Sequence, residues 1–193
     1  MATGYMKRVL TPSVLAAQSA AFGRQYPIPE TPAPDVLGPE EAEFISRRDS
    51  FYLATNNSDG WPYIQHRGGP VGFLKVLSPN ILGFADYKGN RQLLSCGNLV
   101  DSPRVSVFLM DYPNRERLKI LGLAKVVEGR ERVDLWEQCV EGDLRDRVER
   151  LFLIEVVGFD WNCPKYITPR YSAAELEAIV GPLRARIAEL EGR

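Results

Sequence analysis

The strongest constraint on the fold is a run of short β-type segments between residues 51 and 127, each bounded by residues that favour turns. Clusters such as Asn56-Asn57-Ser58-Asp59-Gly60 and Ser78-Pro79-Asn80 mark two of the turns. One more apolar segment follows near residue 151. We therefore predict strands at 51–55, 61–67, 71–77, 81–85, 105–110, 118–127 and 151–157, with Gly122 as a candidate bulge.

The arrangement of these segments predicts a mainly β fold with peripheral helices. Six or seven strands in hairpins, with one helix after the fourth, favour a closed antiparallel barrel with helices packed outside it. Closure suits so many strands because it removes unpaired edges. At 193 residues, the chain suits one such domain with additions at its ends.

The segments outside the strands divide the chain into three parts. Residues 1–39 are expected to form a helix and a proline-rich arm, residues 40–170 the β domain, and residues 171–193 a C-terminal helical segment. The last of these should be interrupted at Gly181-Pro182 because proline disrupts a helix interior. Helices are predicted at 11–23, 38–48, 90–99, 131–140 and 172–190.

Composition excludes several classes of function. The net charge of −1 argues against general binding to nucleic acid or to anionic membranes, which needs a large basic excess. No apolar run approaches the ~20 residues that span a bilayer. Three cysteines without metal-ligand spacing, and a single histidine, argue against a metal site. An odd cysteine count without a signal peptide favours the cytoplasm.

Positive charge is concentrated in one part of the chain. Residues 65–104 hold five Lys/Arg and two acidic residues, so their net charge is +3 and that of the rest of the chain is −4. At the centre of this part, Lys88, Asn90 and Arg91 flank Gly89 where a helix is expected to begin. Free N–H groups and partial positive charge at a helix start, together with two cations, suit a phosphate. An alternative is a glycine turn with an Asn cap and solvated cations.

A second candidate element is Arg67, at a strand end before Gly68 and Gly69. Two glycines permit close approach of a flat ligand or an unusual φ, although a β-bulge with a surface Arg is an alternative. Aromatic residues could contact a flat ligand, although in a barrel they are more often core residues. These aromatic residues are Trp61, Phe84, Tyr87 and Trp161.

The order of these blocks resembles the pyridoxamine 5'-phosphate oxidase-like family of FMN-binding split barrels, and in particular its predicted flavin-nucleotide-binding branch. The resemblance covers roughly residues 40–170. It is carried by Asp49-Ser50-Phe51-Tyr52-Leu53-Ala54-Thr55, Asp59-Gly60-Trp61-Pro62, Gln65-His66-Arg67-Gly68-Gly69-Pro70-Val71-Gly72-Phe73, Asp86-Tyr87-Lys88-Gly89-Asn90-Arg91, Gly97-Asn98-Leu99, Ser102-Pro103-Arg104-Val105 and Trp161-Asn162-Cys163-Pro164-Lys165-Tyr166-Ile167.

The resemblance implies a six-stranded antiparallel Greek-key split β-barrel with flanking helices, and a homodimer with FMN at the subunit interface. It implies that residues 40–170 form the FMN-binding domain. By position, Arg67 and Gly68 would lie beside the flavin, Phe84 and Ala85 along the ribityl chain, and Lys88, Asn90 and Arg91 at the phosphate. Trp161 and Arg170 would lie near the flavin, often from the other subunit.

These expectations imply an FMN-dependent oxidoreductase acting between a nicotinamide donor or another small molecule and the flavin, with no catalytic residue assigned. The C-terminus lacks the basic, histidine-containing motif with which the oxidase binds its substrate, so the resemblance does not extend to pyridoxamine phosphate oxidation. Alternatives are a non-catalytic FMN carrier or sensor, a split barrel that uses deazaflavin or haem, and a barrel without a cofactor.

Overall fold

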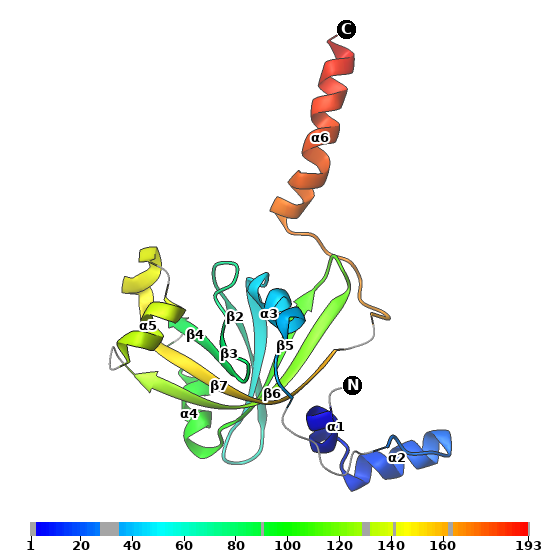
Figure 1. Ribbon diagram of the computed structural model, residues 1–193, viewed down its shortest axis with the longest axis vertical. Helices are drawn as coiled ribbons and strands as arrows, with labels where there is room; N and C mark the ends of the chain where they lie inside the picture. The colour runs from blue at the N-terminus through cyan, green and yellow to red at the C-terminus, as the bar shows by residue number, and fades with distance from the viewer. Residues whose placement is uncertain are drawn as a thin grey trace.

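The fold is one antiparallel sheet of seven strands in the order β2-β1-β5-β6-β7-β4-β3 (Figure 1). The computed structural model describes residues 3–27, 35–89, 91–128, 132–140, 142–161 and 164–192. The strands are β1 (Ser50–Asn56), β2 (Pro62–Gly68), β3 (Lys75–Ser78), β4 (Ile81–Tyr87), β5 (Arg104–Asp111), β6 (Glu116–Glu128) and β7 (Val148–Trp161). The helices are α1 (Thr3–Val9), α2 (Pro12–Phe22), α3 (Pro39–Ser46), α4 (Leu94–Asp101), α5 (Val133–Cys139), the 3-10 helix η1 (Gly142–Arg147) and α6 (Ala173–Glu191).

The prediction of a mainly β antiparallel fold with flanking helices is confirmed, with two corrections. The sheet has seven strands rather than six, and among the described residues it does not close, because β2 and β3 form its two edges. The third predicted strand is shorter than expected. Gly72 adopts a φ of +77°, and the Phe73 N–H donates to the Pro70 carbonyl at 2.9 Å, so a turn replaces the first part of that strand.

The longest pairing, between β6 and β7, contains the predicted bulge. The register shifts between Leu121 and Gly122. A Cβ on Gly122 would lie 2.4 Å from a side-chain carbon of Ile154, so a larger residue has no room there. The predicted bulge at Gly122 is therefore confirmed, and its reason is close packing of two strands.

The core is centred on four buried phenylalanines. The ring of Phe84 stacks on Phe152 with centroids 4.9 Å apart and meets Phe51 edge-on at 5.1 Å, while Phe51 stacks on Phe73 at 5.4 Å. Such ring pairs each add roughly 0.5–1.5 kcal/mol beyond burial of area. They fix β1, β4 and β7 relative to one another, and so fix the end of β4, where the basic residues begin.

The N-terminal part contains one helix that the sequence pattern did not predict. The α1 helix packs on β7 because the Asp35 carboxylate accepts from the N–H groups of Gly4 (3.0 Å), Tyr5 (2.9 Å) and Phe159 (3.1 Å). By contrast, α2 has no buried residue. Its predicted start is confirmed, since the Thr11 hydroxyl accepts from the backbone N–H three residues later, at 3.4 Å.

The C-terminal helix projects away from the sheet (Figure 1), and none of its residues is buried. Its capping box is formed as predicted, with Ser172 and Glu175 each accepting from the other's backbone N–H. The predicted interruption at Gly181-Pro182 is wrong, because α6 continues through Pro182. No helix in the described part of the chain is long and apolar enough to cross a membrane.

Candidate functional site

The candidate site is a hollow of about 470 Å³ where the end of β4 meets the start of β7. The Lys88 N–H donates to the Arg147 carbonyl at 2.7 Å, which fixes the chain after β4 against the start of β7. The volume lies within the range of small-molecule sites. The hollow is lined by Lys88, Gly89, Arg91, Leu93, Glu149 and Arg150.

The chemistry of this lining suits an anion. Lys88 and Arg91 are exposed and Arg150 is half-buried, so the lining holds three cations and one acidic residue, Glu149. Arg150 is also ion-paired with Asp86, Glu128 and Glu149, so Lys88 and Arg91 carry most of the uncompensated charge. Gly89 has a φ of +148°, and no atom lies within 4 Å of where its Cβ would be, so a ligand can approach the backbone there. Several charge-assisted donors around an open backbone are what a phosphate dianion needs.

Beneath the hollow lies a buried ion-pair cluster that no sequence pattern revealed. The Asp86 carboxylate accepts from Arg67 through one oxygen and from Arg150, at 2.9 Å, through the other. Arg67 and Asp86 are 8% and 7% exposed, so both groups are desolvated. The guanidinium of Arg67 lies 4.9 Å from the ring centre of Phe152. Asp86 thus connects the predicted Arg67 to the hollow through Arg150.

This cluster corrects the alternative in which Arg67 is a surface residue at a bulge. Arg67 lies in the interior, and its Nε is buried without a hydrogen-bond partner. The glycines after it serve local packing. A Cβ on Gly69 would lie 2.7 Å from Phe73, and the Gly69 N–H donates to the Asp49 carbonyl. Gly68 is exposed beside His66. The predicted contact of Arg67 and Gly68 with a flavin stays a prediction.

The predicted helix start is displaced along the chain. The α4 helix begins at Leu94 rather than at residue 90, because Leu93 before it adopts a left-handed φ of +54° without a side-chain cap. Asn90 lies outside the described residues. The helix is held to the edge of the sheet by side-chain hydrogen bonds from Ser95 to Gln65 at 2.9 Å and from Asn98 to Thr55 at 2.8 Å. The cations therefore lie on the loop before α4, not on its first turn.

Phe84 and Ala85 occupy the core beneath the site. Phe84 is fully buried, and Ala85 is 2% exposed beside Trp136 and Cys139. Their side chains support the strand that leads to Lys88 and do not line the hollow. Their predicted contact with a ribityl chain stays a prediction.

Trp161 and Arg170 are not brought to this hollow by their own chain. Trp161 donates from Nε1 to Glu41 at 2.8 Å and packs edge-on against Phe44 at 4.8 Å. Arg170 lies over the ring of Tyr112 at 5.1 Å. Trp161 ends β7, whereas Arg150 is near its start, a separation of roughly 35 Å along a strand. Trp161 and Arg150 therefore lie near opposite ends of β7, the strand that is labelled in Figure 1.

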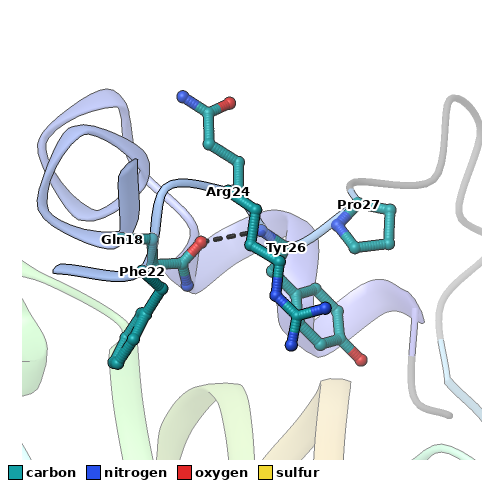
Figure 2. Close-up of a pocket in the computed structure, with 6 residues that line it drawn as sticks. Gln18, Phe22, Arg24, Tyr26 and Pro27 are labelled. Carbon is teal, nitrogen blue, oxygen red and sulfur yellow. Dashed lines mark hydrogen bonds between the residues drawn. The ribbon is translucent and has the colours of Figure 1, made fainter. Parts of the chain in front are cut away.

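A larger hollow of about 790 Å³ lies on the N-terminal arm, and its lining does not suit an anion (Figure 2). There the Gln18 side chain accepts from the Tyr26 N–H at 2.8 Å. Among the described residues that line it, Arg24 is the one cation, beside Phe22 and Pro27. A third hollow, of about 550 Å³, lies by Gly122, and its lining is mainly apolar but includes Arg8 and Arg104. The basic hollow thus remains the candidate site despite its smaller size.

Reactive side chains are scarce in the described part of the chain. Burial raises the pKa of the Cys139 thiol to about 11, which makes it a poor nucleophile. Burial also raises the pKa of Cys96. No group of three or more His, Cys, Asp or Glu among the described residues could hold a metal ion. Neither Cys96 nor Cys139 is among the described residues that line the basic hollow.

A family model for pyridoxamine 5'-phosphate oxidase matches residues 37–153, which is more than half of the chain. The chain belongs to the pyridoxamine 5'-phosphate oxidase family. The matched range contains the residues that line the basic hollow and those of the Asp86 cluster. The candidate site therefore lies within the part of the chain that defines the family. A search of curated proteins gave no match.

Two solved structures share the architecture of this chain. A Lactobacillus delbrueckii protein provisionally assigned as a pyridoxamine 5'-phosphate oxidase is 17% identical, with a TM-score of 0.51, covering 65% of this chain and 94% of that chain. HupZ from Group A Streptococcus is 14% identical, with a TM-score of 0.50, covering 70% and 100% of the two chains. At these identities the likeness shows the fold alone.

Proposed function

We propose that this member of the pyridoxamine 5'-phosphate oxidase family binds FMN and acts as a flavin-dependent oxidoreductase. The observation that carries the proposal is the basic hollow lined by Lys88, Arg91 and Arg150 at the end of β4. A phosphate group at this place would meet three cations and the open backbone of Gly89, and the residues present therefore fit the phosphate of FMN.

The chain's own residues have separate roles in this proposal. Lys88 and Arg91 donate to the phosphate from the loop after β4. Asp86 holds the Arg150 guanidinium at 2.9 Å and so orients the third cation toward the hollow. Arg67 neutralises the second oxygen of Asp86 from the interior. FMN, when bound, supplies the hydride chemistry, and the protein supplies position and charge.

The proposal includes a homodimer with the cofactor at the subunit interface. In one chain, Trp161 and Arg170 lie at the end of β7 far from Lys88 and Arg91, so they can reach the site only from a second copy. A two-fold dimer would then form two equivalent composite sites. A small-molecule substrate or a nicotinamide donor would approach the exposed side of the bound flavin.

The test begins with the visible spectrum of the purified protein. We expect a yellow protein that releases FMN on denaturation and is reduced by NADH or NADPH without oxygen. A flavin that no donor reduces would indicate a carrier or sensor, and a deazaflavin or haem spectrum would indicate a different cofactor. A colourless protein that takes up no added FMN would contradict the proposal.

The phosphate position is tested by Arg91→Ala. Loss of a charge-assisted hydrogen bond costs roughly 1.5–3 kcal/mol, so the Kd for FMN should rise about 10- to 150-fold by fluorescence titration. Arg132→Ala is the matched control, since Arg132 is exposed and does not line the hollow. Equal FMN affinity in both variants would place the phosphate elsewhere.

A further inference from the structure

The α6 helix carries an apolar stripe that the described part of its own subunit leaves uncovered. Leu176, Leu183, Ile187 and Leu190 are 52–60% exposed, and Val180 is half-buried. No residue of α6 is buried, and the helix extends away from the sheet (Figure 1). Exposed large apolar side chains gathered on one helix face mark a contact surface.

The spacing along this stripe is that of a coiled-coil seam. From Leu176 through Val180, Leu183 and Ile187 to Leu190, the steps are four, three, four and three residues. This is the alternation of core positions in a heptad repeat. The positions opposite the seam hold small residues, Ala178 and Ala185, and Pro182 also lies outside the seam. The ring of Pro182 therefore does not occupy the apolar face.

Charged residues beside the seam favour parallel over antiparallel pairing of two copies of α6. In a parallel pair of α6 helices, Arg186 would face Glu191 of the second copy, and the two-fold axis would repeat that attraction. In an antiparallel pair, Arg184 would face Arg184, and Glu177 would face Glu191, so like charges would meet. Within the single helix, Arg184 pairs with Glu177 and Arg186 pairs with Glu189. Both ion pairs are exposed, so replacing them with contacts to a second copy costs little free energy.

We propose that α6 pairs in parallel with α6 of a second copy of this chain. Fifteen residues of seam are short for a coiled coil that forms alone. The inference therefore rests on the proposed homodimer, which holds two copies of α6 at high effective concentration. Pairing at the C-terminal helix would in turn favour the dimer in which one subunit's Trp161 and Arg170 reach the other's phosphate site.

The experiment uses the full chain with Leu190→Cys, and Ala185→Cys as the matched control on the opposite face of the same helix. In a parallel pair, residue 190 meets residue 190 of the second copy, whereas residue 185 points outward. Under mild oxidation, Leu190→Cys should form a disulfide-linked dimer roughly ten-fold faster than Ala185→Cys, because only its sulfur atoms meet at bonding distance. Wild-type protein, oxidised in the same way, measures how much dimer forms through the native cysteines alone. Peptide mass spectrometry identifies the residues joined by each disulfide.

Direction is tested by mixing Leu190→Cys with Leu176→Cys. A parallel pair should give links between like positions, whereas dominant links between 176 and 190 would overturn the parallel arrangement. Light scattering on the same samples separates this inference from the proposed function. A dimer in which Leu190→Cys links no faster than Ala185→Cys overturns the α6 pairing alone. A monomer at all concentrations overturns both the pairing and the homodimer.

Discussion

Replacing Asp86 by asparagine is the sharpest perturbation of the site, because one carboxylate neutralises two largely buried guanidinium groups. Asp86→Asn keeps the size of the side chain and removes its charge. Arg67, whose side chain is 9% exposed, would then lose the counter-charge of Asp86, whereas Arg150, 12% exposed, would keep Glu128 at 3.4 Å and Glu149 at 3.5 Å. Removing one partner of a buried ion pair costs about 3–5 kcal/mol.

The assay is urea unfolding followed by circular dichroism, with thermal unfolding as a second measure. For a chain of this size, 3–5 kcal/mol corresponds to a fall in Tm of roughly 6–20 °C. Asp134→Asn is the matched control, since Asp134 pairs with Arg132 on the surface and should leave stability unchanged. Arg67→Met combined with Asp86→Asn should recover part of the loss by removing one orphaned charge. A cost below about 1 kcal/mol for Asp86→Asn would mean that the cluster is hydrated, and would refute the reasoning.

Two further predictions concern packing and pH. Gly69→Ala should destabilise the protein by about 1–3 kcal/mol, because its Cβ would lie 2.7 Å from Phe73, whereas Gly97→Ala meets no atom within 4 Å and should be neutral or stabilising in chemical unfolding. Burial works to raise the pKa of Asp111, but hydrogen bonds from Asn114 and an ion pair outweigh it, and the pKa is lowered from its ordinary 3.8. The free energy of unfolding should therefore fall as pH drops through 3.8 and below, because the unfolded chain then takes up the proton before the folded chain does. Asp111→Asn should make this fall shallower when urea unfolding is measured across the same pH range. A variant with the same pH profile as the wild type would contradict this prediction.

Local chemistry explains why much of the fold could be predicted from the sequence. Turn clusters and alternating apolar residues are short-range signals, so the positions of β1, β2, β5 and the bulge at Gly122 were expected. The closed barrel was not correct, because β2 and β3 remain edges of the sheet, and a turn at the left-handed Gly72 replaces the first part of the predicted third strand. The α1 helix was missed because Asp35, 30 and 31 positions along the chain from Tyr5 and Gly4, supplies the acceptors that fix it.

Only part of the candidate site could be predicted from the sequence. Lys88 and Arg91 were visible as cations beside a glycine, and the structure places both at the hollow. Arg150 and the role of Asp86 were missed, because a shared carboxylate is a contact between residues 64 positions apart. The one available signal was a charged residue at the edge of a mainly apolar segment, and such a residue is more often solvated than functional.

The most direct test of the composite FMN site mixes two defective chains. Arg91→Ala damages the phosphate side, and Arg170→Ala damages the side that a second copy would supply. At an FMN concentration where each variant alone is largely empty, refolding equal amounts together should restore about one quarter of the wild-type sites, because half of the two-fold dimers are mixed and each holds one intact site. Recovery to that level is the predicted result. No recovery above the separate variants, or an Arg170→Ala protein that binds FMN like wild type, would contradict a site shared between two subunits.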